Sequence, residues 1–534
     1  MPGPAATHSG AHAIADAGRG LVAAGFPDAA RLGAEALRRG GNAADAACAA
    51  AWALAVCEPA ESGLGGQAFA VVAWPDGRAE VVDGSSRAPR RAARSSVSRE
   101  QQSAGRRAST VPSAPAALDD LQRRFGRFDP ADALGAAAEL ADAGHRLTPL
   151  QSRQVRWTAD ALSADPLARR LFFGDDGSPK APGARIRQPE LARTLRRLAD
   201  AGVDDFYRGE TARAIAEDQA RAGGLIDARD LAAVAGPAHP PPLEIEWAGR
   251  RVVSAPPPSG GATTLLALLL LERFEARTDA PSLTDRAIAI ARAGRAALRE
   301  RDRWPDHPDD LTESIRRWLV SRERADAVFT RSVADDAPGA DARSETGDTT
   351  HLCAADGEGM TVSMTLSIQS VFGAKVMCQP AGFFYNNSLT TCPRSPHPYR
   401  LAVGAAPRSN ASPLVLLAER PGGWTPEFAL GAAGSRRMIA ALLRTLEAAC
   451  VHGDSLPEAI RAPRIHAPVS RGVWVERPLL RRIDRDRLTR ACGPITVLPR
   501  LAYKAGAVHA VRRLPDGRVA GAADPRRDGA VVAE

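Results

Sequence analysis

Asp348-Thr349-Thr350-His351 stands at the junction between two very different kinds of sequence. Residues 334–348 (ADDAPGADARSETGD) are small and polar and offer nothing to bury, so we expect a flexible linker there. Residues 349–355 and 360–367 are two strand-like runs, and Asp356-Gly357-Glu358-Gly359 between them is a turn signal. A self-cleaving hydrolase with an N-terminal nucleophile needs this arrangement, in which a hydroxyl residue begins a strand behind a flexible leader.

Thr349 is the candidate nucleophile of such a hydrolase. Cleavage between Asp348 and Thr349 would free the α-amine of Thr349 beside its own hydroxyl group. That amine has an ordinary pKa of about 7.7–8.0, close enough to neutrality to serve as the general base. Nucleophile and base then belong to one residue, which is the threonine variant of nucleophilic catalysis. Thr-Thr-His also begins many ordinary strands, so a purely structural strand start is the competing interpretation.

Length and composition indicate a soluble protein with a large core. A chain of 534 residues exceeds a single typical core and predicts two lobes or one large layered domain. The net charge of +8 comes mostly from arginine, since the only lysines are Lys180, Lys375 and Lys504. The arginines are scattered and aromatic residues make up only 5% of the chain, so we expect a solvated arginine-rich surface and no nucleic-acid binding.

Targeting, membrane and metal-binding signals are missing from the sequence. The first residues (MPGPAATHSGAHAIADAG) lack a charged region followed by an apolar one, so we expect no secretory signal and a cytoplasmic protein. The longest apolar runs, 46–57 and 262–271, are too short to span a bilayer. The cysteines are odd in number and lack the spacing of metal ligands. We therefore expect reduced thiols, no metal and no cofactor.

The order of the predicted elements indicates an α+β protein. A helix over 28–39 ends at Gly40-Gly41, and Asn42 is placed to cap a second helix over 43–57. Residues 58–66 form a glycine-rich loop that lacks the lysine and the strand-before-helix context of a phosphate-binding loop. A mainly helical middle over 112–330 separates strand-rich segments at 68–74, 79–83, 349–367, 414–430, 472–476 and 505–521. This order favours layers in which helices cover a central pair of sheets.

Eight motifs in sequence order resemble the γ-glutamyltranspeptidase family. They are GGNAADAACAAAWALAVCEPAESGLGG (40–66), RQPELARTLRRLADAGVDDFYRGETARAI (187–215), GGLIDARDLAAV (223–234), PPPSGGATTLLALL (256–269), TTHLCAADGEGMTVSMTLSIQSVFG (349–373), GFFYNN (382–387), RSNASP (408–413) and GAAGSRR (431–437). The resemblance covers nearly the whole chain and implies the four-layer αββα sandwich of the N-terminal-nucleophile hydrolases. It also implies self-cleavage between Asp348 and Thr349 into a large subunit of residues 1–348 and a small subunit of residues 349–534, which stay associated.

The same resemblance implies catalytic roles for a few residues. Thr349 would attack first the carbonyl that precedes it and later the amide of a substrate, and the acyl group would pass to water or to an amine acceptor. Ser367 matches the hydroxyl residue that steadies the amine of the nucleophile. Gly434 and Ser435 match the paired glycines whose N–H groups form the oxyanion hole, where one donor is worth about 2.7–4 kcal/mol of barrier. The structural alternative for Ser435 is a helix N-cap before Arg436.

The positions that would hold the substrate depart from the family pattern. The arginine expected for a substrate carboxylate falls on Ser85, and Arg87, on the same face of an extended chain, is its candidate replacement. A surface arginine before a turn proline is the structural alternative for Arg87. The other substrate-side candidates are Gln369 in place of an asparagine, Ser388 and Thr391 in place of a glutamine and an aspartate, the retained Ser409, and Asn410 in place of a serine. A zwitterionic head group needs opposite charges on both sides, so we expect the specificity to differ from that of glutathione-acting members.

Three functions stay open at this point. The first is a γ-glutamyltransferase or glutathione-hydrolase-like enzyme that cleaves γ-glutamyl amides with a rearranged head-group site. The second is an acylase of the same fold that cleaves another amide, such as a dicarboxylic-acyl side chain of the glutaryl or cephalosporin-acylase type. The third is an unprocessed, non-catalytic binding or structural protein, which the substituted site residues favour and the intact Asp348-Thr349 junction opposes.

Overall fold

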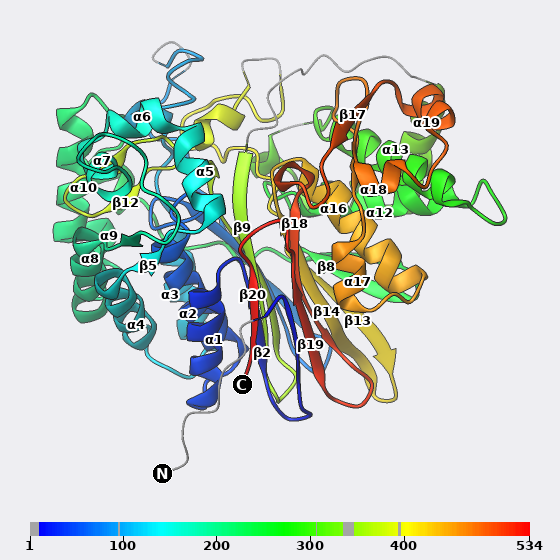
Figure 1. Ribbon diagram of the computed structural model, residues 1–534, viewed down its shortest axis with the longest axis horizontal. Coiled ribbons are helices and arrows are strands. Elements are labelled where there is room, and N and C mark those ends of the chain that lie inside the picture. The colour runs from blue at the N-terminus through cyan, green and yellow to red at the C-terminus, as the bar shows by residue number, and fades with distance from the viewer. Residues whose placement is uncertain (1–9, 94–96, 306, 335–346, 394–396) are drawn as a thin grey trace.

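Two antiparallel sheets form the centre of the molecule, and helices cover the outer face of each sheet (Figure 1). The structure is a computed structural model that describes residues 10–93, 97–305, 307–334, 347–393 and 397–534. Residues 335–346, which make up most of the predicted linker, lie outside the described residues.

The first sheet contains the Asp348-Thr349 junction. Its strands are β2 (Leu21–Ala24), β3 (Gln67–Ala73), β4 (Ala79–Gly84), β9 (Gly347–Ala355), β10 (Thr361–Ser370) and β20 (Ala530–Ala533). They run in the order β20-β2-β9-β10-β3-β4, and every neighbouring pair is antiparallel. Because β2, β3 and β4 precede the junction while β10 and β20 follow it, this sheet interleaves the two parts of the chain.

The second sheet also mixes strands from both sides of the junction. Its strands are β1 (His12–Ala15), β7 (Leu243–Trp247), β8 (Arg250–Ser254), β13 (Leu414–Arg420), β14 (Gly423–Ala433), β18 (Ala507–Arg513) and β19 (Val519–Ala523). Their order is β1-β19-β18-β14-β13-β8-β7. The β7–β8 hairpin is an exception to the mainly helical middle, because LEIEW alternates buried and exposed side chains and Ala248-Gly249 turn with positive φ.

Alanine-rich helices pack on the outer face of the first sheet. They are α1 (Pro27–Arg38), α2 (Ala43–Cys57), α3 (Ala114–Phe125), α4 (Pro130–Ala143) and α8 (Pro189–Ala201). α1, α2 and α3 contact the strands, and α4 packs on both α2 and α8. α2 is buried along its whole length, which its small side chains permit, and Asn42 caps it in a capping box with Asp45. The predicted helix over 43–57 and its cap are confirmed.

A second set of helices covers the other sheet. They are α12 (Gly261–Glu275), α13 (Leu283–Arg301), α15 (Arg322–Ala334), α16 (Arg437–Leu446) and α17 (Leu456–Arg461). α12 contacts β7 and β8, α16 contacts β14 and β18, and α17 contacts β18 and β19. α13 packs on α12 (Figure 1). α15 also packs on α12.

Further helices and short strands complete the structure. The helices are α5 (Pro149–Trp157), α6 (Ala159–Ser163), α7 (Pro166–Phe172), α9 (Asp205–Arg208), α10 (Glu210–Arg221), α11 (Ala228–Ala232), α14 (Glu313–Trp318), α18 (Arg477–Leu480) and α19 (Arg485–Cys492). The strands are β5 (His145–Arg146), β6 (Arg185–Ile186), β11 (Met377–Cys378), β12 (Phe383–Phe384), β15 (Ile465–His466), β16 (Val473–Glu476) and β17 (Ile495–Leu498). Within the described residues, none of the helices has the length and apolar character needed to cross a membrane.

Separate hydrophobic cores define the layers. One core joins the first sheet to its helices and contains Trp52, and another joins the second sheet to its helices and contains Leu268. A third core lies between the two sheets. Neighbouring residues of β9 divide between two cores, since Leu352 packs with the first helical layer and Cys353 packs between the sheets. The predicted α+β, four-layer αββα sandwich is therefore confirmed.

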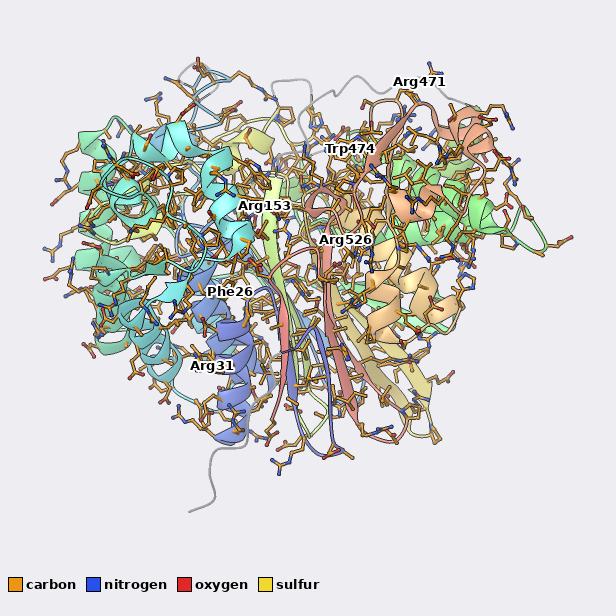
Figure 2. The ribbon with its side chains drawn as sticks, in the orientation of Figure 1. Phe26, Arg31, Arg153, Arg471, Trp474 and Arg526 are labelled. Atoms are coloured by element: carbon orange, nitrogen blue, oxygen red, sulfur yellow. The ribbon has the colours of Figure 1, made fainter. Side chains whose placement is uncertain are left out.

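Arginines are buried as well as exposed. Arg31 and Arg471 lie at the periphery, whereas Arg526 lies in the interior, where it donates to Glu476 at 2.6 Å and to Asp524 at 3.0 Å (Figure 2). The other buried arginines of the described chain are Arg295, Arg301, Arg408, Arg436, Arg437, Arg464 and Arg527. The expectation of a solvated arginine-rich surface is thus only partly right. Burying a guanidinium is costly unless it is paired, so these residues mark places where polar partners meet.

Acid is expected to destabilise the protein through His509, which is fully buried on β18. Burial lowers the pKa of His509 to about 4, against the opposing charge of Asp524. A histidine in an unfolded chain has a pKa near about 6.5, so between these values the unfolded state binds more protons. The contribution of the neutral, buried His509 to the free energy of unfolding is therefore fully present above about pH 6.5. It is lost as the pH falls toward about 4.

Urea unfolding at about pH 7 and about pH 5 measures this effect. His509→Gln should lose less stability on acidification than the unaltered protein, and replacement of the exposed His12 by glutamine should leave the pH dependence unchanged. An H509Q variant with the full acid sensitivity of the unaltered protein would contradict the assignment.

Candidate active site

Thr349 is the third residue of β9 and is buried beside Ser367 of β10. The two strands pair antiparallel with Gln369 opposite Asp348, and the register shifts just before Gln369. This bulge lies at Ser367 and places its Oγ 3.2 Å from Oγ1 of Thr349. Both side chains are shielded from solvent, since each residue is only 5% exposed. The structure therefore brings together the two hydroxyl residues predicted from the sequence.

The Ser367 hydroxyl links Thr349 to the carbonyl that precedes it. Ser367 Oγ donates to the carbonyl oxygen of Asp348 at 2.9 Å and accepts the N–H of Gln369 at 2.9 Å. Because a hydroxyl has one proton to donate, Thr349 must be the donor in its contact with Ser367. The hydrogen bonds thus run from the Thr349 hydroxyl through Ser367 to the carbonyl of the Asp348-Thr349 peptide. They orient the hydroxyl and polarise that carbonyl.

Gly434 and Ser435 lie between the end of β14 and the start of α16. Their φ angles are +122° and +59°, a region that glycine adopts freely and serine rarely. Ser435 Oγ lies 2.6 Å from the position of an ideal Cβ on Gly347, so this turn packs directly against the junction. The alternative role of Ser435 as an N-cap is wrong, because Arg436 is the residue before α16 and the helix has no side-chain cap hydrogen bond.

Buried charged side chains surround the junction. Arg527 donates to the carboxylates of Glu61 and Asp348 and, at 3.3 Å, to the carbonyl of Thr349. Burial raises the pKa of Asp348 well above its ordinary value and raises the pKa of Glu58 to about 7. A carboxyl group such as Glu58, whose pKa is about 7, is suited to taking up and releasing protons beside this peptide.

Lys375 brings a further cation to the region. It follows β10 in a turn where Phe372, Gly373 and Lys375 have positive φ, and its Nζ donates to the carbonyl of Gly373 at 2.6 Å. Burial lowers the pKa of Lys375 to about 8, against the opposing charge of Asp348. This lysine therefore loses its charge at a lower pH than an ordinary surface lysine does.

Arg527, Glu58, Glu61 and Lys375 are not among the site residues predicted from the sequence. The two glutamates belong to the glycine-rich loop 58–66. Two acidic residues in an otherwise small and apolar segment were the only feature of the sequence that could have marked this loop as part of the site. Arg527 is 178 residues from Thr349, and no local pattern marks it. Only the fold brings these charges to the junction.

Arg87 is already engaged in an ion pair, which competes with its predicted role of binding a substrate carboxylate. Its Nη1 lies 2.6 Å from Oδ1 of Asp309, and its side chain remains 44% exposed. Although burial raises the pKa of Asp309, the hydrogen bond from His307 and the charge of Arg87 hold it below its ordinary value. Ser85 is buried, and its N–H donates to Asp83. A substrate carboxylate would therefore have to compete with Asp309 for Arg87.

Gln369 lies against the junction, and Asn410 contacts the Ser435 turn beside it. Nε2 of Gln369 is 3.1 Å from the ideal Cβ position on Gly347, and Nδ2 of Asn410 donates to Oγ of Ser435 at 3.4 Å. Two predicted substrate-side residues thus reach the region around Gly347, on the acyl side of the Asp348-Thr349 bond.

Ser388, Thr391 and Ser409 make mainly local contacts. Thr391 Oγ1 donates to the carbonyl of Ser388 at 2.9 Å inside a 3-10 turn, and Ser409 Oγ accepts the N–H of Ala411 at 3.1 Å. The buried Ser388 hydroxyl has no hydrogen-bond partner within the described chain. Thr391 offers no charge to an ammonium group. Among the residues that the structure describes, no group of three or more histidine, cysteine, aspartate or glutamate side chains is arranged to hold a metal ion.

The chain is similar to known proteins over nearly its whole length. The family model described as Gamma-glutamyltranspeptidase matches residues 29–534. The chain is 32% identical to "Acylase ACY 1 proenzyme" of Pseudomonas sp. (strain SE83), over 97% of this chain and 94% of that protein. It is 26% identical to "Glutathione hydrolase proenzyme" of Escherichia coli (strain K12), over 95% and 90%. The crystal structure of cephalosporin acylase from Bacillus halodurans is similar with a TM-score of 0.82 and 26% identity, over 99% and 98% of the two chains.

Removal of the Ser367 hydroxyl is expected to slow attack of Thr349 on the Asp348 carbonyl. Ser367→Ala deletes the donor to that carbonyl, and loss of one such donor costs about 10²–10³ in rate. Ser367→Thr keeps a hydroxyl group at the same position and is the matched control. The rate at which full-length protein from cell-free synthesis converts to two fragments measures the effect. Equal rates for S367A and the unaltered chain would contradict this role.

Proposed function

The chain belongs to the γ-glutamyltranspeptidase family, and from this premise we propose that it is an amide hydrolase that cleaves itself between Asp348 and Thr349. Thr349, with its new amino terminus, then serves as the nucleophile toward substrates. The observation that carries the proposal is the pair of hydrogen bonds from Thr349 to Ser367, at 3.2 Å, and from Ser367 to the Asp348 carbonyl, at 2.9 Å.

Self-cleavage follows from this geometry as an acyl shift from nitrogen to oxygen. Thr349 Oγ1 attacks the carbonyl carbon of Asp348 while Ser367 stabilises the charge that develops on the carbonyl oxygen. The hydroxyl proton of Thr349 ends on the departing amide nitrogen, and an ester joins Asp348 to Thr349 Oγ1. Water then hydrolyses the ester, which leaves a carboxylate on Asp348 and a free α-amine and hydroxyl on Thr349.

Substrate turnover repeats the chemistry with an external amide. The α-amine of Thr349, with an ordinary pKa of about 7.7–8.0, accepts the hydroxyl proton and passes it to the departing amine. The acyl group rests on Thr349 Oγ1 until water or an amine acceptor takes it. The N–H groups of Gly434 and Ser435 are the proposed donors to the oxyanion. Their positive-φ turn beside Gly347 supports this role.

The two fragments are proposed to stay together as a large and a small subunit. Strands from both sides of the junction pair with one another in each sheet, and both sides also contribute to the core between the sheets. Separation would expose that core and break several strand pairs, so a single broken peptide does not favour dissociation.

The substrate is proposed to be an amide whose acyl half lacks an α-ammonium group. Thr391 stands where the family pattern has an aspartate, and its hydroxyl group already donates to the carbonyl of Ser388, so a buried ammonium group would find no opposite charge on this side chain. The similarity to acylases over nearly the full chain supports this choice. A γ-glutamyl amide is the second candidate, because Arg87 remains partly exposed beside Asp309 and glutathione hydrolases are also similar.

Thr349→Ala is expected to remain a single full-length chain. The variant lacks the hydroxyl that would attack Asp348, whereas Thr349→Ser retains a nucleophile and should still give two fragments. Thr350→Ala, at the next position of the same strand, is the matched control and should cleave normally. A denaturing gel and the mass of the smaller fragment, beginning at residue 349, measure the outcome. A T349A variant that still splits at this bond, or an unaltered chain that never does, would refute the proposal.

A pair of chromogenic anilides tests the substrate class. Glutaryl and γ-glutamyl anilides differ only by the α-amino group, so their ratio of kcat/KM reports how the site treats an ammonium group. We expect the glutaryl compound to be favoured by about tenfold or more, since an unpaired buried polar group costs about 1–3 kcal/mol. Faster turnover of the γ-glutamyl compound would overturn the preferred substrate class and support the second candidate.

A further inference from the structure

Two hydrogen bonds connect Arg301 to Ser435. Arg301 is the last residue of α13 and is only 1% exposed. Its Nη1 donates to Oδ1 of Asn410 at 2.8 Å and to the carbonyl of Ser409 at 3.3 Å. Nδ2 of Asn410 in turn donates to Oγ of Ser435 at 3.4 Å. A buried guanidinium therefore reaches the turn beside the junction through one amide side chain.

Arg301 determines which way the Asn410 amide points. A guanidinium only donates hydrogen bonds, so the oxygen of the amide must face it and the NH₂ group must face Ser435. Ser435 Oγ is then the acceptor in that contact, and its own proton is left to point elsewhere. The same hydroxyl also lies beside Gly347, whose ideal Cβ position is 2.6 Å away. The Ser435 side chain is thus held between Asn410 and the junction.

The backbone of Ser435 needs such support. Its φ of +59° is sparsely populated for serine, and such conformations persist only where their surroundings fix them. If this residue relaxed to a negative φ, the N–H groups of Gly434 and Ser435 would turn to new directions. Asn410 and Ser435 are also two positions at which the sequence departs from the family pattern, and the structure places these two departures in contact.

We infer that Asn410, oriented by Arg301, is a positioning residue that holds Ser435 in the left-handed conformation and so fixes the direction of the oxyanion-hole N–H groups. A side-chain contact thereby replaces the conformational freedom that a glycine has at this position. The catalytic consequence rests on the proposed function, whereas the effect on the conformation of Ser435 does not.

A double-mutant cycle between Asn410 and Ser435 tests the inference. N410A should lower kcat of the processed enzyme on the faster anilide by about tenfold, because a left-handed residue without support relaxes, and should change KM little. S435G removes the need for support, because glycine adopts positive φ without strain. N410A in the S435G background should therefore cost less than about threefold. Equal losses of kcat in the two backgrounds would overturn the inference.

The urea unfolding midpoint gives a second cycle that needs no substrate. The decrease caused by N410A should be smaller in the S435G background than in the unaltered chain. Asn42→Ala, which removes the distant cap of α2, is the matched control and should lower the midpoint equally in both backgrounds. If N410A lowers the urea midpoint equally in the unaltered chain and in the S435G background, the inference is overturned. If the effects of N410A and S435G on the midpoint are not additive but the protein turns over no amide, the proposed function is refuted. The role of Asn410 in holding the conformation of Ser435 then still stands.

Discussion

A peptide bond buried inside a sheet must find partners for its carbonyl and N–H groups, and this requirement shapes the surroundings of the Asp348-Thr349 junction. The carbonyl of Asp348 accepts from Ser367, the N–H of Thr349 donates to the Asp348 carboxylate at 3.1 Å, and the carbonyl of Thr349 accepts from Arg527. Only one of these partners belongs to the neighbouring strand, because the bulge in β10 interrupts the regular ladder. The groups that make burial of the peptide tolerable are therefore also those placed to act on it.

The charges beneath the junction depend on the same burial. Taking a carboxylate and a guanidinium out of water is repaid only when each has close partners, and Arg527 contacts the carboxylates of both Glu61 and Asp348. Cleavage would give Asp348 a new terminal carboxylate and Thr349 a new ammonium group, which changes the charge balance around Arg527. Burial raises the pKa of Glu58 to about 7, so near neutral pH this carboxyl group can gain or lose a proton in response to the new charges. A site of this kind can accommodate both the uncut and the cut chain.

The sequence predicted what local chemistry determines and failed where distant segments meet. The α2 helix and its Asn42 cap were predictable because capping and helix propensity act over a few residues. Ser367 was predicted beside Thr349 only through the family resemblance, since the register shift between Leu366 and Gln369 is not marked by the turn that joins the two strands. The contacts of Arg527 with Thr349 and of Arg301 with Asn410 span 178 and 109 residues, and no pattern in the sequence marks either pair. Ser435 was assigned a possible capping role from residue type alone, and its backbone conformation excludes that role.

Strained backbone is concentrated around the junction. The non-glycine residues with positive φ in the described chain are Ala248, Gln369, Phe372, Lys375, Ser435 and Leu501. Three of them, Gln369, Phe372 and Lys375, lie on β10 or the turn that follows it. Gln369 and Ser435 both lie close to Gly347. Such conformations are unfavourable by themselves and survive where surrounding contacts fix them. A carbon atom added at the Cβ position of Gly347 would collide with Ser435, so the strained Ser435 turn and the junction hold one another in place. Gly347 is thus enclosed by Ser435 and Gln369, two of the positions at which this chain departs from the family pattern.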